Sequence, residues 1–163
     1  MASNDSRSLF ILTFRQLINT RHVRHWALFL ARPGEEDTGN MYHVVYSVNK
    51  SVSQSIQATA PLCGTKYDVG FATVEEYNPV NSRALTSKTF VASEIYETDI
   101  LEIGAQIEKK YPYTIADNNC QNFVIRVLNE LLARGKVTQE QYNEARKGAG
   151  DTVFTAWDKV CTS

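Results

Sequence analysis

The stretch Asp117-Asn118-Asn119-Cys120-Gln121-Asn122-Phe123-Val124 changes from a polar run into an amphipathic helix. After the polar run, apolar residues recur at helical spacing, at Phe123, Val124, Val127, Leu128, Leu131 and Leu132. An asparagine at 118 or 119 is a suitable N-cap, because its side-chain oxygen can accept an orphan backbone N–H. Gly135 supplies a stop signal. The pattern therefore predicts that Cys120 lies in the first turn of a buried helix.

This predicted position favours a reactive thiol. A helix N-terminus carries roughly half a positive charge together with unpaired N–H groups, and both stabilise a thiolate. Such surroundings can lower the pKa of a cysteine from about 8.5 to about 7 or below. The N–H groups of the first turn can also stabilise an oxyanion. The alternative is a buried structural cysteine, since free cysteines are among the most buried residues.

Composition limits the classes of protein to which the chain can belong. The chain has 163 residues, 43% of them hydrophobic, which predicts one globular domain over residues 1–163. The formal charge is −1 and basic residues are scattered, so no nucleic-acid partner is expected. No apolar stretch approaches the roughly 20 residues that span a bilayer. Residues 1–8 also lack the apolar core of a signal peptide. We therefore expect a soluble, cytoplasmic protein without an integral membrane segment.

The cysteines and histidines do not predict a metal or another cofactor. The three cysteines are Cys63, Cys120 and Cys161. An odd number at wide spacing, without a CxxC pair, argues against a disulfide scaffold and a structural zinc site. A cluster of Cys120 with His22, His25 and His43 is conceivable. However, His22 and His25 are three residues apart, which on a strand puts them on opposite faces. Phosphate-binding glycine loops do not occur either.

Strands dominate the first part of the chain. Residues 25–32 and 41–48 read as a hairpin, joined by an exposed loop over residues 33–40 that contains Pro, Gly, Asp and Asn. Alternation places His25, Ala27 and Phe29 on one face of the first strand and Trp26, Leu28 and Leu30 on the other. Further strands are predicted within residues 66–76 and 89–96, and within residues 8–17, which could instead begin a helix.

Helices dominate the second part. Besides the helix of Cys120, the sequence predicts a helix to about Lys110 capped by Thr98. A capping box of Thr138 and Gln141 opens another, which extends to about Lys147, and Asp151 caps a last one. Strands first and helices last indicate an α+β domain with a small antiparallel sheet and a helical half.

A cysteine nucleophile needs an imidazole to take its proton and usually a third group to orient that imidazole. His25 and His43, on neighbouring predicted strands, could supply both parts beside Cys120. The alternative is that each histidine is a structural residue of its strand. His22 lies among arginines and is expected to be solvated. The acidic pair Glu35 and Glu36 is expected to be a solvated charge run rather than an acid–base pair.

Three blocks in this order resemble the circularly permuted papain-fold cysteine enzymes, specifically the lecithin–retinol acyltransferase-like group with its small phospholipase/acyltransferases. The blocks are Val23-Arg24-His25-Trp26-Ala27-Leu28-Phe29, Tyr42-His43-Val44-Val45 and Asn119-Cys120-Gln121-Asn122-Phe123-Val124. The chain is also similar to small fungal proteins with a His-Trp-Ala strand and a Tyr-His-Val strand. The resemblance covers less than a third of the chain.

The resemblance implies a permuted papain-like order, in which the histidine strands come first and the cysteine helix later. It implies Cys120 as the nucleophile, His25 as the general base and His43 as the orienting residue. The family's second histidine usually follows the Val-Val pair, where this chain has Tyr46, so His43 and Tyr46 both stay open as the third residue. Gln121 and Asn122 stand where the family has Glu and His.

The function expected from these features is a soluble cysteine-dependent hydrolase or acyl transferase. It would act through a thioester acyl-enzyme on an amide, ester or thioester, so the expected partner is a small-molecule or peptide-like substrate. Two alternatives stay open. One is a non-catalytic binding or accessory module on the same scaffold, and the other is a peptidase of a ubiquitin-like modifier.

Overall fold

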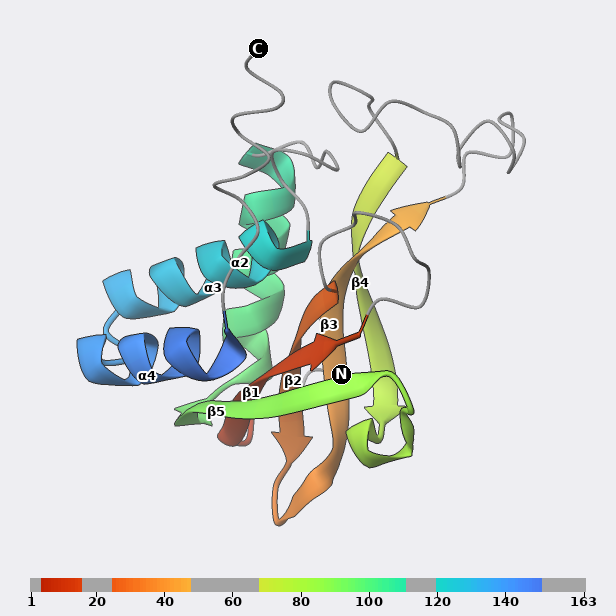
Figure 1. Cartoon of the computed structure of the whole chain (residues 1–163). Coiled ribbons are helices and arrows are strands. Elements are labelled where there is room, and N and C mark those ends of the chain that lie inside the picture. Colours follow the sequence, from red (N-terminus) through yellow and green to blue (C-terminus); the bar gives the residue numbers. More distant parts are fainter. Residues whose placement is uncertain (1–3, 16–24, 48–67, 111–119, 151–163) are drawn as a thin grey trace.

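A computed structural model describes residues 4–15, 25–47, 68–110 and 120–150 of the chain (Figure 1). The described part contains one antiparallel sheet with the strand order β4-β3-β2-β1-β5. The elements are β1 (Arg7–Phe14), β2 (His25–Arg32), β3 (Glu35–Ser47), β4 (Asp68–Tyr77), the 3₁₀ turn η1 (Pro79–Asn81), β5 (Leu85–Ile95), α2 (Glu97–Lys110), α3 (Cys120–Ala133) and α4 (Gln139–Ala149). The predicted α+β class with an antiparallel sheet is thereby confirmed.

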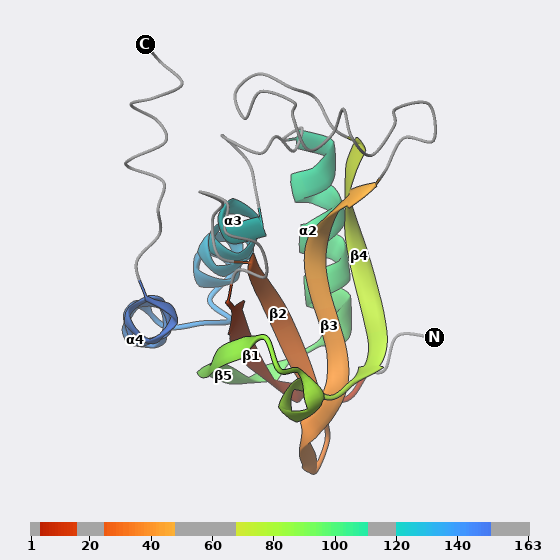
Figure 2. The same ribbon diagram turned by 45° about the vertical axis from the view of Figure 1, so that its right-hand side comes forward.

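The three helices pack on one face of the sheet, and each face of the sheet has its own apolar core. Figures 1 and 2 show α4 beside β5 and β1 and α3 beside β2 and β3, while α2 lies over the part of the sheet toward β4. The helix-side core joins Trp26, Leu28 and Leu30 to the apolar stripes of α2 and α3. The far-side core contains Ala27, Phe29 and Ala31 together with residues of β1 and β3. The alternation predicted for residues 25–30 is therefore confirmed.

The hairpin of β2 and β3 differs from the prediction. The expected loop over residues 33–40 is wrong, because β3 already begins at Glu35. Only Pro33 and Gly34 form the turn, with Gly34 at φ +79°, a conformation that glycine adopts without steric cost. The residues that looked like a loop are polar because the tip of the hairpin extends into solvent, where Glu35, Glu36 and Asp37 are exposed.

Several helix signals are confirmed, with small shifts at the ends. The first helix begins at Glu97 rather than after Thr98. Thr138 and Gln141 form the predicted capping box: the Gln141 N–H donates to Thr138 Oγ1 at 3.1 Å, and the Thr138 N–H donates to Gln141 Oε1 at 2.9 Å. The predicted helix after Asp151 and the proposed caps Asn118 and Asn119 lie outside the described residues.

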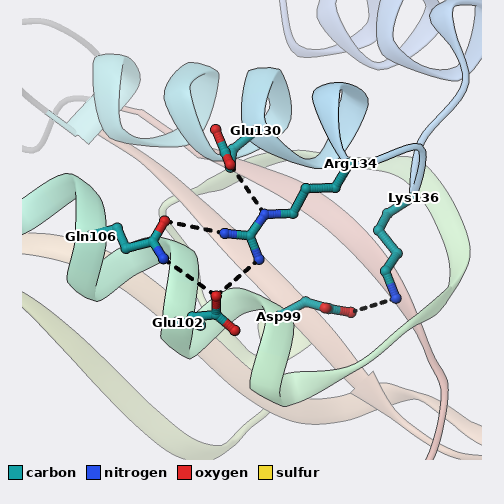
Figure 3. Close-up of polar contacts among 6 residues, drawn as sticks. All are labelled: Asp99, Glu102, Gln106, Glu130, Arg134 and Lys136. Atoms are coloured by element: carbon teal, nitrogen blue, oxygen red, sulfur yellow. Dashed lines mark hydrogen bonds and ion pairs between the residues drawn. The ribbon is translucent and has the colours of Figure 1, made fainter.

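A polar network joins the C-terminal end of α3 to α2 (Figure 3). The guanidinium of Arg134 donates to three side chains, namely Glu130 at 3.1 Å, Glu102 at 3.2 Å and Gln106 at 3.1 Å. Lys136, just beyond α3, forms an ion pair of 3.5 Å with Asp99. Because these groups are partly exposed, each pair stabilises the fold only modestly.

Within the described ranges, none of the helices combines the length and the apolar character needed to cross a bilayer.

Candidate active site

The strands β2 and β3 part at the end of the sheet where β2 begins. Their ladder runs from the pair Arg32–Glu35 to the pair Leu28–Tyr42. Within the described strands, residues 25–27 of β2 pair only with β1, and β3 from His43 onward pairs only with β4. Figures 1 and 2 both show β3 turning away from the start of β2, with the first turn of α3 close to that start. The three predicted site residues belong to these three segments.

Two of the predicted site residues meet directly. His25 Nε2 and His43 Nδ1 lie 3.0 Å apart, the distance of a good hydrogen bond. The ring centroids are 5.2 Å apart and the ring planes cross at 72°. On its other side His25 packs against the ring of Phe14, with centroids 5.6 Å apart. The prediction that the two histidines lie together is consistent with this geometry, and His43 is in position to orient His25.

Both imidazoles are uncharged at neutral pH. Burial, and secondarily the charge of His43, lowers the pKa of His25 to about 4. Burial also lowers the pKa of His43. In a neutral pair, one ring nitrogen donates its proton and the other accepts it. Because the two rings share a hydrogen bond, assigning the tautomer of one histidine also determines the tautomer of the other.

Cys120 is the first residue of α3, as predicted, but its acidity differs from the expectation. Burial raises the pKa of the Cys120 thiol to about 11, against the opposing effect of backbone N–H groups of Trp26, Gln121 and Cys120 itself. The sequence predicted a lowered pKa from the helix N-terminus alone. In the structure the loss of solvation outweighs the N–H donors, so the resting group at neutral pH is the thiol.

The thiol and the imidazole pair approach the start of β2 from opposite faces of the sheet. Cys120 packs against the helix-side core that contains Trp26. His25 contacts Phe14, which belongs to the far-side core. The two groups nevertheless lie beside the same short segment of β2. The backbone N–H that bonds to the Cys120 sulfur belongs to Trp26, which directly follows His25. All three candidates thus gather where β2 and β3 part.

The remaining candidates do not extend this site. Tyr46 of β3 pairs with Val69 of β4, but the side chain of Tyr46 is not among the described parts of the structure. His22, Cys63 and Cys161 lie outside the described residues. Among the residues that are described, no three His, Cys, Asp or Glu side chains lie close enough to hold a metal ion. Glu35 and Glu36 are exposed at the hairpin tip, at the opposite end of β2.

Sequence reasoning missed two parts of this site. The contact of Phe14 with His25 follows from the register of β1 and β2, in which Phe14 lies opposite His25. The apolar run over residues 8–17 signalled a strand but carried no register. The N–H of Trp26 beside the sulfur is a backbone group, so no residue type could have pointed to it.

No family model, no curated protein and no solved structure matches the chain.

The raised thiol pKa gives a first testable prediction. At pH 7 a thiol with a pKa of about 11 is ionised in about one molecule in ten thousand. The rate at which iodoacetamide alkylates Cys120 in the folded protein is therefore expected to climb with pH beyond 9 without a plateau. Peptide mapping by mass spectrometry at each pH measures this rate. The same residue in guanidinium-denatured protein is the control and should titrate near about 8.5. A plateau below pH 8 in the folded protein would show that the thiol is activated instead.

Proposed function

We propose that the protein is a cysteine-dependent hydrolase or acyl transferase in which Cys120 is the nucleophile, His25 the general base and His43 the residue that orients His25. The proposal includes the permuted papain-like order of the elements. The observation that carries it is the His25–His43 hydrogen bond of 3.0 Å beside the strand residue whose N–H reaches the Cys120 sulfur. Acyl transfer requires a nucleophile, a base and an orienting group together, so the proposal requires the Cys120 thiol to come within hydrogen-bond reach of His25.

The proposed role of His25 as the base determines the proton positions of the histidine pair. Nε2 of His25 is engaged with His43, which leaves Nδ1 of His25 as its nitrogen for proton exchange. To act as a base, Nδ1 must be unprotonated, so the proton of His25 lies on Nε2 and is donated to His43 Nδ1. His43 then carries its own proton on Nε2. In this arrangement His43 fixes both the tautomer and the orientation of the base.

The first chemical step follows from this arrangement. The Cys120 sulfur attacks the carbonyl carbon of the substrate while its proton moves to His25 Nδ1. The sulfur–carbon bond forms, and the carbonyl π bond becomes a tetrahedral oxyanion. Backbone N–H groups at the start of α3 are available to stabilise this oxyanion. Collapse of the oxyanion then breaks the bond to the leaving group, which takes the proton from His25 and leaves a thioester. Water or another acceptor subsequently releases the acyl group.

The pKa values of the Cys120 thiol and the His25 imidazole determine the order of proton transfer and attack. With a thiol pKa of about 11 and an imidazole pKa of about 4, the resting pair is neutral rather than a thiolate–imidazolium ion pair. Proton transfer must therefore accompany the attack of sulfur on carbon instead of preceding it. It also requires the thiol to turn from the Trp26 N–H toward the imidazole at the start of β2.

The proposal is tested by trapping the acyl-enzyme. Purified protein is incubated with p-nitrophenyl esters, acyl thioesters and acyl amides of graded chain length, quenched in acid and analysed as the intact chain and as peptides. We expect at least one class to leave an acyl group on Cys120, and none to do so in Cys120→Ala. Cys63→Ala serves as the matched control and should behave as the wild type. Acyl groups spread over several cysteines or lysines, or none at all, would overturn the proposal.

One observation favours a second candidate, a binding module on the same scaffold. The thiol is protonated at neutral pH and Cys120 packs against the helix-side core, whereas His25 contacts Phe14 of the far-side core. A structural cysteine would have this environment. The two candidates are separated by the acyl-enzyme experiment, because a binding module forms no covalent adduct at Cys120 with any of the three substrate classes.

A further inference from the structure

The proposed base His25 contacts two other rings. Its Nε2 atom meets Nδ1 of His43 at 3.0 Å, and the ring of Phe14 lies against it with centroids 5.6 Å apart and planes tilted by 39°. Phe14 is the last residue of β1 and His43 belongs to β3, so these contacts come from the strands on both sides of β2. Phe14 is buried, whereas both histidines are half-buried. The imidazole of His25 therefore rests on a buried aromatic side chain.

The register of the sheet explains why Phe14 meets His25. The two residues lie directly opposite each other in the β1–β2 ladder, and residues paired in this way carry their side chains on the same face of the sheet. On the other side of β1, the ladder with β5 shifts directly before Phe14, where Thr86 is an extra residue of β5. Such bulges re-aim side chains and recur next to active sites.

Hydrogen bonds on both sides of Phe14 fix this end of β1. Before it, the buried Thr13 hydroxyl lies 2.8 Å from the hydroxyl of Thr86, and Thr86 Oγ1 donates to the backbone oxygen of Thr13 at 2.9 Å. After it, the Arg15 N–H donates to the backbone oxygen of Ala84 at 2.7 Å. The backbone of Phe14 is therefore tied to β5 and to the segment before it, which keeps its ring directed at β2.

The contact with Phe14 also affects the charge of His25. Burial is the main reason why the pKa of His25 is low, and the charge of His43 is the second. A ring in contact with the imidazole takes the place of water that would otherwise solvate the protonated form. Phe14 is apolar and offers the imidazolium no hydrogen bond in return. It therefore contributes to keeping His25 unprotonated, which is the state that a general base requires.

Few charged or titratable groups surround the proposed base. His43 faces it from β3, and Cys120 lies at the start of α3 beside the same end of β2. On β1 the apolar Phe14 is followed by the charged Arg15, which is exposed. Residues 85–87 of β5, opposite this end of β1, are uncharged. In a variant that keeps both His43 and Cys120, a changed imidazole pKa therefore reports on the contact with Phe14.

We propose that Phe14 is a positioning residue of the candidate active site, which holds the imidazole of His25 on His43 and excludes water from it. This inference rests on the proposed role of His25 as the base. With Nε2 directed at His43, the imidazole presents Nδ1 for proton exchange. Removing the ring of Phe14 leaves space in which the imidazole can turn about its Cβ–Cγ bond and release His43. A misplacement of about 1 Å can lower a catalytic rate about a hundredfold.

The first test needs no substrate. NMR of the ¹⁵N- and ¹³C-labelled histidine side chains of the full chain measures the tautomer and the pKa of His25 in the wild type and in Phe14→Leu, which keeps an apolar side chain but not the flat ring. We expect the wild type to hold the single Nε2–H tautomer. In Phe14→Leu we expect a mixture of tautomers and a pKa of His25 that is higher by about one unit.

Phe10→Leu is the matched control. Phe10 lies on the same strand and in the same far-side core as Phe14, and the exposed fractions of the two side chains are 6% and 8%. Its ring packs on Phe29 and Phe90. Phe10→Leu should therefore destabilise the protein to a similar degree, as measured by chemical denaturation, and leave the tautomer and the pKa of His25 as in the wild type.

Activity supplies the second readout. With the substrate found by acyl-enzyme trapping, Phe14→Leu is expected to lower kcat/KM at pH 7 about tenfold and to move the acid limb of the pH profile upward, whereas Phe10→Leu leaves the pH profile unchanged. A changed His25 signal in Phe14→Leu of a protein that forms no acyl-enzyme would support the contact and contradict the proposed function alone.

The inference is overturned if Phe14→Leu leaves both the tautomer and the pKa of His25 unchanged, or if Phe10→Leu changes them equally. If Phe14→Leu does not fold, the wild type decides. A single Nε2–H tautomer, together with a nuclear Overhauser effect between the rings of Phe14 and His25, supports the inference, and mixed tautomers or the absence of that effect overturns it.

Discussion

Replacing Cys120 with alanine is expected to abolish turnover of whichever ester, thioester or amide acylates the protein, and His25→Ala is expected to lower kcat/KM by at least about a thousandfold. The reason is that the acyl group has no other attachment point, and that a thiol with a pKa of about 11 cannot react at neutral pH without a base to take its proton. His43→Ala should cost less, because His43 acts by orienting His25. Steady-state rates with the substrate found by acyl-enzyme trapping measure all three effects.

The pH profile distinguishes a catalytic role of His25 from a structural one. The base must be unprotonated, and its pKa is about 4, so kcat/KM should fall as pH drops through about 4 and stay level from about pH 5 to above pH 8. His43→Ala removes the charge that contributes to this low pKa and should move the acid limb upward. Circular dichroism over the same range confirms that the fold persists. A pH profile that His43→Ala leaves unchanged, or a His25→Ala variant with wild-type kcat/KM, would contradict the assigned roles.

The third site residue is decided by a separate pair of variants. If His43→Ala leaves kcat/KM unchanged and Tyr46→Phe lowers it, Tyr46 is the third residue.

The largest effect on stability is expected for Gly39→Ala. A Cβ atom at Gly39 would lie 2.2 Å from the backbone oxygen of Leu30 and 2.8 Å from Cα of Ala31. Both atoms belong to the neighbouring strand β2, so no side-chain rotation can relieve the clash and the hairpin must separate. We expect the free energy of unfolding to fall by about 3 kcal/mol. For a chain of this size, that corresponds to a melting temperature lower by about 10 °C. Chemical denaturation and thermal unfolding measure the two quantities.

Gly34→Ala is the matched control in the same hairpin. Gly34 has a φ of +79°, but a Cβ there would meet no atom within 4 Å. Its cost is therefore only the conformational one, about 1 kcal/mol. Equal destabilisation by the two substitutions would show that the close approach of β2 and β3 is not what Gly39 provides.

The core of the fold could be predicted from alternation, whereas the hairpin tip could not. Successive side chains of residues 26–31 alternate between the helix-side core and the far-side core, so the two faces of β2 were predicted correctly, as were its bounds. Residues 35–37 also belong to a strand, β3, but they extend beyond the core into solvent, and an exposed run of acidic residues has the composition of a loop. Sequence patterns indicate which residues are buried, and they indicate strand pairing only where the paired strands are buried.

The site was predicted as a set of residues but not as a geometry. The contact between His25 and His43 depends on the register Leu28–Tyr42, which in turn depends on a two-residue turn and on the shift in pairing after Ala31. Pro33 and Gly34 signal a turn but not its length, and the shift in pairing has no sequence signal. The direction of the Cys120 pKa was missed for a related reason. A helix start can be recognised locally, whereas the burial that outweighs it comes from residues distant in the chain.

The pairing of one imidazole with another, rather than with a carboxylate, leaves the proposed catalytic group electrically neutral. His25, His43 and Cys120 carry no net charge at neutral pH, so none of them exerts a long-range attraction on an approaching molecule. Electrostatic steering is the component of an association rate that salt suppresses. The proposed catalytic group is therefore expected to contribute no salt-dependent term to the rate at which a substrate associates.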